Sequence, residues 1–449
     1  MIYDTIAAIS SPHGTGAISI IRITGELSLK IVEESLKNQK TQSKKMCFGY
    51  FYSEEKKLDE ITWVFHQAPY SFTGEDMLEI FCHGGKIITE KIFQSILKKG
   101  IREAVAGEFS KRAVLNGKMD LIKAESINNL IHAKTDKSAD FFSNQMNNGI
   151  SSEIDKIKEF LLNQIAEIEV SMDYPDDFEL DSEKIKDTLK NTLEEIENIL
   201  KNSENGLIIS EGIKTVIIGK PNSGKSTLLN SLLKKDRAIV TDIPGTTRDT
   251  IEEDLNISGI HIKIIDTAGI RETEDKVEKI GIEKTNKAIE ESNLVIAIFD
   301  MSNFGDKDDF IIADKIKLLK DKNIIIVFNK EDITKISEEE IRKYFSGYNI
   351  IIVSAKNSKI ENLEKKIYDI YKNKVEIETP VIFEKRHKYS LIKTEEFLKN
   401  AINAINNGVT FDFIMYDIRK ALESLLELKG ETYDEILLDK IFSSFCVGK

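Results

Sequence analysis

Cysteine, proline and tryptophan are scarce in this 449-residue sequence, which has three, six and one of them respectively. Cys47, Cys82 and Cys446 are far apart and form no CxxC pair, which argues against a disulfide framework or a zinc site and favours a reducing compartment. No stretch of about 18 apolar residues occurs, and no basic segment precedes the short apolar run near the N-terminus. We therefore expect a cytoplasmic protein without a membrane partner.

Basic residues are also fewer than acidic ones. The sequence has 63 Lys and Arg against 76 Asp and Glu, a formal net charge of −13 at pH 7, and this balance excludes a broad cationic surface that coats nucleic acid. Any contact with nucleic acid must therefore use a local patch. Hydrophobic residues make up 41% and charged residues 31%, which is typical of a folded protein. At about 150 residues per domain, the length predicts about three domains.

Four segments differ in their hydrophobic patterning. Residues 1–118 mix short β-type runs with one strong helix pattern, which predicts a compact α+β domain. Residues 119–211 repeat apolar positions every three or four residues, and residues 373–449 resume this helical pattern. Between them, in residues 212–372, short β-branched runs alternate with helical segments, as in a doubly wound parallel sheet. We expect a multidomain protein in which an all-α domain, formed from two chain segments, is interrupted by an inserted α/β domain.

A phosphate-binding loop motif occupies Gly219–Ser226, with the sequence GKPNSGKS, between a β-branched run and a helical run. Its glycines let backbone N–H groups curl around phosphates, Lys225 reaches the terminal phosphates, and the Ser226 hydroxyl is expected to ligate Mg²⁺. The motif requires a strand before it and a helix after it, and both are expected here. This segment predicts binding of a nucleoside triphosphate.

Three further segments complete a nucleotide site. Asp266–Gly269 (DTAG) ends another apolar run, where an acid can approach the Mg²⁺ and a glycine N–H can sense the γ-phosphate. Asn329–Asp332 (NKED) follows a later run, and its Asp332 carboxylate can accept both N–H donors of a guanine edge. Ser354–Lys356 (SAK) supplies backbone contacts around the base. In this order, the elements resemble a translation-factor-type GTPase domain, so GTP is the expected nucleotide.

The catalytic details are less usual than the binding motifs. Ile270 stands where Ras-like proteins carry the glutamine that orients the attacking water, so the water must be positioned in another way. The segment Thr241–Asp249 offers oxygens that could hold a monovalent cation in place of an arginine finger, and its Thr247 is the expected second Mg²⁺ ligand. The acids within Glu272–Glu283 leave the water-orienting residue open. The residues expected to bind GTP are Asn222, Ser223, Gly224, Lys225, Ser226, Thr227, Thr241, Asp242, Ile243, Pro244, Gly245, Thr246, Thr247, Asp266, Thr267, Ala268, Gly269, Asn329, Lys330, Asp332, Ser354, Ala355 and Lys356.

Several motifs outside the GTPase segment are characteristic of one family. They are Tyr70–Asp76 (YSFTGED), Glu79–Gly85 (EIFCHGG), Ala106–Ser110 (AGEFS), Leu115–Leu121 (LNGKMDL) and the terminal Phe445–Lys449 (FCVGK). Together with the GTPase motifs, they make the chain closely resemble the tRNA-modification GTPase family MnmE, also called TrmE, over essentially its whole length.

This resemblance implies a function that the spacing of residues alone does not. The family acts with a FAD-containing partner of the MnmG (GidA) type, in a heterotetramer or larger complex, and installs an aminomethyl or carboxymethylaminomethyl group at C5 of the wobble uridine of certain tRNAs. A tetrahydrofolate, in its 5,10-methylene or 5-formyl form, carries the one-carbon unit. By motif match, the N-terminal domain would contact the folate together with the C-terminus, through Arg22, Glu79, Lys118 and Lys449. Cys446 matches a cysteine that the family requires for modification, although a small buried apolar residue is an equally good interpretation.

The resemblance also implies how GTP is hydrolysed. The family uses K⁺, and two of its GTPase domains meet face to face with K⁺ at the interface. The K⁺ ligands would be Asn222, Thr241, Ile243 and Thr246. The water-orienting acid of the family corresponds to Glu278, so Glu278 and Lys225 are the expected catalytic residues. A homodimer is implied as well, with the N-terminal domain as its permanent interface.

One alternative stays open, a GTPase switch that binds ribosomal RNA during ribosome assembly. Relatives with that role usually carry a KH-type module with a GxxG loop after the GTPase domain. The tail of this chain is instead predicted to be helical, and it ends in Cys446–Lys449. The sequence therefore favours tRNA modification.

Overall fold

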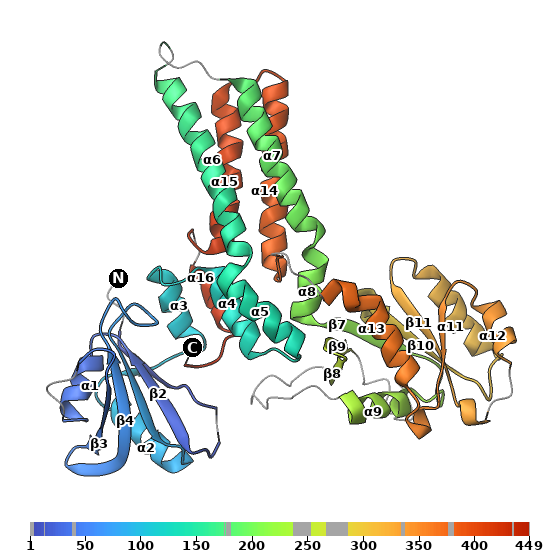
Figure 1. Cartoon of the computed structure of the whole chain (residues 1–449), viewed down its shortest axis with the longest axis horizontal. Helices are drawn as coiled ribbons and strands as arrows, with labels where there is room; N and C mark the ends of the chain where they lie inside the picture. The colour runs from blue at the N-terminus through green and yellow to red at the C-terminus, as the bar shows by residue number, and fades with distance from the viewer. Residues whose placement is uncertain are drawn as a thin grey trace. The chain divides into compact units, whose positions relative to one another are not determined.

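The computed structural model describes residues 4–12, 14–37, 42–174, 176, 181–236, 253–265, 286–333, 337–375, 381–432 and 435–448. The chain forms two compact units, each with its own six-stranded sheet (Figure 1). The first unit comprises Met1–Asn128, Ile154–Met172 and Phe411–Lys449, and the second comprises Asn129–Glu153 and Asp173–Thr410.

The sheet of the first unit has the strand order β3-β4-β5-β2-β1-β6. Its strands are β1 (Ile6–Ile9), β2 (Ile18–Thr24), β3 (Met46–Ser53), β4 (Lys56–His66), β5 (Met77–His83) and β6 (Arg102–Glu103). All neighbours pair antiparallel except β1 and β6, which are parallel. Antiparallel pairing lets one face of a sheet pack against a core while the other carries different chemistry.

The two faces of this sheet differ sharply. Alternate residues such as Ile21, Trp63 and Ile80 are almost completely buried and pack in one core with α1 (Ser28–Glu34) and α2 (Lys86–Leu97). On the other face, Ile18 and Phe48 are 62% and 65% exposed. Because side chains alternate along a strand, the sequence pattern buries one face and leaves apolar side chains on the opposite one.

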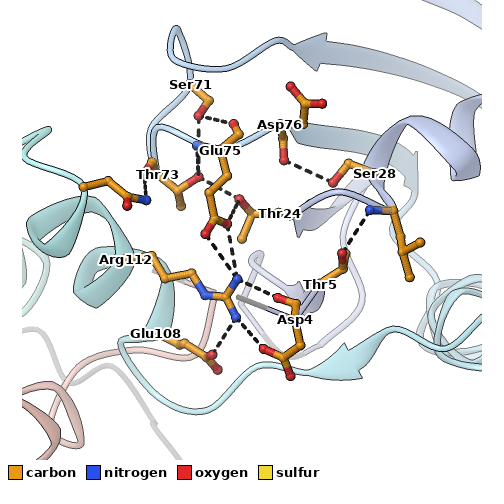
Figure 2. A network of polar contacts seen from close by, with 12 residues as sticks. Asp4, Thr5, Thr24, Ser28, Ser71, Thr73, Glu75, Asp76, Glu108 and Arg112 are labelled. Carbon is orange, nitrogen blue, oxygen red and sulfur yellow. Dashed lines mark hydrogen bonds and ion pairs between the residues drawn. The ribbon is translucent and has the colours of Figure 1, made fainter. Parts of the chain in front are cut away.

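A buried arginine ties three parts of the first unit together (Figure 2). Arg112, on α3 (Glu108–Leu115), has a side chain that is only 3% exposed. Its guanidinium donates to the carboxylates of Asp4 at 3.0 Å, Glu108 at 3.0 Å and Glu75 at 3.2 Å. Thr24 donates to the same Glu75 carboxylate at 2.9 Å. The chain start, the loop before β5 and α3 are therefore held by one charged centre.

Helices complete the first unit. They are most of α4 (Leu121–Ile131), most of α6 (Ile150–Asp173), α15 (Phe411–Lys429) and α16 (Glu435–Phe442). Ion pairs join α6 and α15 at two levels, Arg419 with Glu169 and Lys429 with Asp155. Beyond α16 the chain turns back on α3, where the backbone N–H of Gly107 donates to the carbonyl of Cys446 at 3.2 Å.

The sheet of the second unit has the order β12-β11-β10-β7-β9-β8. Its strands are β7 (Ile213–Ile218), β8 (Glu253–Ile257), β9 (Ile260–Ile264), β10 (Leu294–Asp300), β11 (Asn323–Asn329) and β12 (Asn349–Ile352). Every residue of β10 is buried, as expected for a parallel strand covered on both faces. The strands expected from the sequence, β7, β9, β10, β11 and β12, pair parallel as predicted. The sequence did not predict β8, which pairs antiparallel with β9 at the edge of the sheet. Ser258 and Gly259 both have positive φ, and such a two-residue turn forces a hairpin.

Helices cover both faces of this second sheet. One core contains residues of α9 (Lys225–Asp236) and α13 (Glu361–Val375), and the other contains residues of α11 (Lys307–Leu318) and α12 (Glu338–Tyr344). The described residues of this unit also form α5 (Asp136–Asn148), α7 (Ser182–Lys201), α8 (Ser203–Glu211) and α14 (Lys385–Asn406). The predicted fold class is confirmed: an α+β N-terminal part, helical segments on both sides of an insertion, and an inserted α/β domain.

Two of these helices illustrate the sequence pattern. In α7, buried Ile185, Leu189 and Ile196 recur at helical spacing and the helix packs against α14. The Asp181 side chain accepts from the backbone N–H groups of Glu183 and Lys184 and so caps the start of α7. Of the helices in the described ranges, none is both long enough and apolar enough to cross a membrane.

The Arg112 centre generates a stability prediction. Replacing Arg112 by Met leaves the largely buried Glu75 carboxylate without its guanidinium and removes one of the two guanidiniums that bond Glu108, the other being that of Arg102. We therefore expect a loss of about 3 kcal/mol of unfolding free energy at pH 7. Hydrogen bonds from Arg102 hold the pKa of Asp4 below its usual value. Burial raises the pKa of Glu108, but bonds from Arg102 and Arg112 outweigh it and leave that pKa lowered.

A folded-state pKa below the unfolded value stabilises above the unfolded pKa, and this stabilisation disappears as pH falls through the folded pKa. The difference between Arg112→Met and wild type should therefore shrink below about pH 4. Urea unfolding can be followed by the fluorescence of Trp63, the single tryptophan, which is 2% exposed in the same sheet. Lys91→Met, on the exposed face of α2, is the control. A pH-independent difference would contradict the electrostatic explanation.

Candidate functional site

The phosphate-loop segment joins β7 to α9. Asn222 and Gly224 have φ of +61° and +98°, so the chain turns tightly and directs backbone N–H groups inward before the helix begins. The Lys225 ammonium donates to the carbonyls of Gly219 at 3.0 Å and Lys220 at 2.9 Å. The lysine is thereby held across the loop, where a phosphate-binding lysine is required.

A buried asparagine connects this loop to two later segments. Asn329, at the end of β11, donates from Nδ2 to the Ser223 carbonyl at 3.1 Å and accepts at Oδ1 from the Ala355 N–H at 3.0 Å. Its side chain comes so close to Gly224 that a Cβ there would lie 2.1 Å from Nδ2. The structure thus brings the loop, the NKED segment and the SAK segment together, as the carboxyl ends of neighbouring parallel strands should.

The residues expected to recognise the base are held by side-chain bonds. Asp332 accepts a hydrogen bond from the Ser354 hydroxyl at 2.7 Å, which lowers the pKa of that carboxyl. Lys330, with φ of +70°, donates to Asp300 at 2.6 Å. Asp332 is therefore an ionised acceptor at neutral pH, beside a lysine stem fixed in direction, and both features suit a purine ring with N–H donors.

One element of this site could not be identified by motif. Lys220, within the phosphate loop, donates to Asp306 at 2.6 Å and to Asp309 at 2.9 Å. Asp309 is completely buried. Burial lowers the pKa of Lys220, but the bonds to Asp306 and Asp309 outweigh it and raise that pKa. The loop is thus anchored to the start of α11, in addition to its link through Asn329.

Some predicted site residues lie outside the described residues. They are Thr241, Asp242, Ile243, Pro244, Gly245, Thr246, Thr247, Asp266, Thr267, Ala268, Gly269, Glu278 and Lys449. The strands next to two of these segments are described, because β8 begins at Glu253 and β9 ends at Ile264, two residues before Asp266.

A second charged cluster lies in the first unit, on the exposed face of its sheet. Arg22 on β2 donates from Nε to Glu79 on β5 at 2.8 Å, and His66 at the end of β4 lies 3.2 Å from the other oxygen of Glu79. A second guanidinium nitrogen of Arg22 donates to the Gly448 carbonyl at 3.3 Å. Three adjacent strands and the chain end therefore meet at one point, and the side chains of Arg22 and Glu79 are 24% and 17% exposed.

Two other residues that the sequence predicts for a site in the N-terminal unit are Lys118 and Cys446. Lys118 is exposed and donates to the carbonyl of Pro69 at 2.8 Å, three residues after His66. Cys446 is partly exposed and lies two residues before Gly448. The sequence did not single out His66. His66 lies at the end of β4, next to the strand that carries Glu79. The sequence does not give the pairing register of these two strands, so it could not show that the two side chains are close.

Two family models match this chain. The model of the MnmE helical domain matches residues 121–446, and the model of the GTP-binding protein TrmE N-terminus matches residues 5–118. A tRNA modification GTPase MnmE of Petrotoga mobilis is 53% identical over 100% of this chain and 100% of its own. A protein of the same name from Fervidobacterium nodosum is 45% identical, covering 99% and 98%. Another from Clostridioides difficile is 42% identical, covering 100% of both.

The anchor at Lys220 predicts an effect on nucleotide binding. Lys220→Met removes charge-assisted bonds of about 1.5–3 kcal/mol and leaves the buried Asp309 carboxylate without a cation, although it keeps the bond from the Gly305 N–H. We therefore expect guanine-nucleotide affinity to fall about tenfold or more. Fluorescent GDP titration measures this change. Lys317→Met, at an exposed paired lysine on α11, is the matched control. Unchanged affinity in Lys220→Met would show that the anchor does not support the loop.

Proposed function

Because this chain belongs to the tRNA modification GTPase MnmE family, we propose that it is the GTP-hydrolysing component of a complex that modifies C5 of the wobble uridine in tRNA. The observation that carries this proposal is Asn329, which joins a phosphate loop to guanine-recognition segments in a chain that matches its relatives from end to end. The product would be an aminomethyl or carboxymethylaminomethyl uridine.

In the GTPase domain, Lys225 would bind the terminal phosphates, and Asp332 would accept from the guanine edge. Ser226 and Thr247 would hold Mg²⁺, which neutralises phosphate charge when bound. The helix start at Lys225 supports this role for Ser226, because its hydroxyl follows directly after the phosphate-binding lysine. The remaining GTP-binding residues are those predicted from the motifs.

The catalytic water would be oriented by Glu278, since Ile270 occupies the place of a glutamine. K⁺ would be held by Asn222, Thr241, Ile243 and Thr246, and would supply positive charge beside the phosphates when two GTPase domains meet. The positive φ of Asn222 supports this proposal. It places at the turn of the phosphate loop a short side chain whose amide oxygen can ligate a cation.

The N-terminal unit would bind a tetrahydrofolate, which carries a one-carbon unit when bound. Arg22 and Lys449 suit the carboxylates of such a molecule, and Glu79 suits the N–H groups of a pterin. The arrangement of this cluster supports the proposal: Arg22 and Glu79 are partly exposed, and the Gly448 carbonyl, one residue before Lys449, bonds to Arg22. Lys118, which donates to the Pro69 carbonyl, would join them.

Dimerisation would use the open face of the N-terminal sheet. Met46 and Phe48, on edge strand β3, are 63% and 65% exposed, and Ile18 on β2 is 62% exposed. Apolar side chains gathered on one sheet face mark an interaction surface, and a second copy of the chain offers the same chemistry. This face supports a homodimer, and a FAD-containing MnmG-type protein would join it to act on tRNA in the cytoplasm.

The domain limits also remain a proposal. We place the folate-binding and dimerisation domain at 1–118, the two parts of the helical domain at 119–211 and 373–449, and the GTPase domain at 212–372. Helix α13 runs to Val375, just past the last of these limits.

The proposed mechanism of GTP hydrolysis is tested by exchanging K⁺ for Na⁺ and by replacing Glu278. We expect GTP turnover to be much faster in K⁺ than in Na⁺, and Glu278→Ala to lower turnover while leaving GTP affinity nearly unchanged, because the water is oriented only as hydrolysis proceeds. Lys225→Ala is the control: it should lose GTP turnover because the terminal phosphates are no longer bound by this lysine. Equal turnover in the two cations would exclude the K⁺ mechanism, and a matching loss of affinity in Glu278→Ala would exclude its assigned role.

Folate binding is tested at the other cluster. Arg22→Ala should weaken binding of 5-formyl-tetrahydrofolate by about tenfold or more, since a charge-assisted bond is worth about 1.5–3 kcal/mol. Isothermal titration measures the affinity, and GTP turnover of the same variant should stay normal. Lys91→Ala, on the exposed face of α2, is the control. Folate affinity that is unaffected by Arg22→Ala would remove this cluster as the folate site.

A further inference from the structure

The second unit contains a cavity of about 460 Å³ that neither proposed site uses. Its walls come from the end of α4, the connection to α5, α5 itself, α8, the start of α14 and the strands β7, β8 and β9. Figure 1 shows α5 and α8 beside β7 and β9. Phe142, Ala133 and Ile209 supply apolar walls. The volume lies within the usual range for small-ligand sites.

Lysines dominate the charged lining of this cavity. Lys134, Lys214, Lys263 and Lys385 line it, against two carboxylates, Glu211 and Asp254. The lining therefore carries an excess of two positive charges, apart from His132 and His261. The chain as a whole has a net charge of −13. Such a chain can bind an anion only where basic side chains cluster, as they do in this cavity.

Each carboxylate contacts two basic side chains. Glu211 lies 3.0 Å from Lys214 and 2.8 Å from Lys385. Burial raises the pKa of Glu211, but the bonds from these two lysines outweigh it and leave the pKa lowered. Both acids are ionised at neutral pH, since His261 likewise lowers the pKa of Asp254. One carboxylate cannot neutralise two lysines, so the cavity attracts a further negative charge.

The second carboxylate connects the cavity to the GTPase strands. Asp254, on β8, accepts from His261, on β9, at 2.8 Å, and lies 3.7 Å from Lys134 in the connection before α5. The His261 ring packs on the backbone of Gly212, where a Cβ would lie 2.5 Å from Nδ1. The hairpin is thus fixed against the helical wall by an ion pair and a close ring contact.

We propose that this cavity binds a phosphate-bearing anion, held by Lys134, Lys214, Lys263 and Lys385, and that its occupancy acts on the GTPase through the β8–β9 hairpin. Phosphate matches the site because a dianion balances the excess charge and its oxygens accept from several ammonium groups at once. The phosphate can belong to an RNA backbone or to a free phosphate compound.

The route to the GTPase follows the chain. β8 follows the predicted switch segment Thr241–Asp249, and β9 leads into Asp266–Gly269. An anion that draws Lys134 away from Asp254 changes how the hairpin between these two segments is held. This coupling rests on the proposed GTPase function, whereas anion binding itself does not.

Binding is tested on the full chain with inorganic pyrophosphate and with tRNA, in saturating GDP so that the phosphate loop is filled. Wild type should bind pyrophosphate saturably, and Lys134→Gln combined with Lys385→Gln should weaken binding by tenfold or more. Lys134→Arg with Lys385→Arg keeps the charge and should retain binding. Lys317→Gln, an exposed paired lysine elsewhere in the unit, should behave as wild type, and thermal melting establishes that all variants are folded.

The two phosphate sources give different results with tRNA. If the Gln pair also weakens tRNA binding, and pyrophosphate competes with tRNA, the ligand is an RNA phosphate; if tRNA affinity is unchanged, it is a free phosphate compound. Absence of saturable pyrophosphate binding by wild type, or equal binding by the Gln pair, would overturn the site.

GTP turnover separates the coupling from the proposed function. At saturating GTP, pyrophosphate should change the turnover of wild type and leave that of the Gln pair unchanged. Equal responses of the two proteins would overturn the coupling. A chain that binds pyrophosphate through Lys134 and Lys385 but neither binds nor hydrolyses GTP would refute the proposed function and leave the anion site intact.

Discussion

The amide of Asn329 is the constraint on which the GTPase site depends. A buried amide must satisfy both its donor and its acceptor, and Asn329 does so by bonding to the Ser223 carbonyl and the Ala355 N–H. These partners belong to segments 106 and 26 residues away. The bond therefore fixes the distance between the part of the site that would hold phosphates and the part that would hold the base. Gly224 is required for the same reason, because any Cβ would collide with this amide.

A second connection runs through the loop that follows β10. Asp300, the last residue of β10, bonds Lys330, whereas Asp306, just before α11, and Asp309, in its first turn, bond Lys220. The β10–α11 connection thus contacts both the NKED segment and the phosphate loop, in addition to the bonds of Asn329. Two independent links resist relative displacement better than one, since each limits a different direction of movement. Pre-organisation of this kind lowers the cost of ordering the site when a nucleotide binds.

The sequence predicts contiguous chemistry well and distant partners poorly. The phosphate loop, NKED and SAK segments were recognisable because each acts through neighbouring residues at the end of an apolar strand. Lys220 was visible in the motif, but its partner Asp309 lies 89 residues later and on a helix with no motif of its own. The role of Arg112 was equally hidden, because its carboxylates come from the chain start, a loop and its own helix.

Strand direction shows the same limit. The alternation of strands and helices predicts a parallel sheet, and five of its six strands follow that rule. The β8–β9 hairpin departs from it because two residues with positive φ leave no room for a crossover helix. Serine is not typical of the first position of such a turn, whereas glycine is typical of the second, so the sequence indicates the turn only through Gly259.

Two family motifs of the first unit, AGEFS and the terminal FCVGK, pack against each other. Gly107 of the AGEFS motif has φ of +67°, and a Cβ there would lie 2.4 Å from the Phe442 carbonyl and 2.9 Å from the Phe445 side chain. The chain end can approach α3 only because this residue is glycine. That approach carries Gly448 to Arg22, where its carbonyl accepts a hydrogen bond. A larger side chain at residue 107 would therefore act at a distance, by displacing the tail from the charged cluster on the sheet.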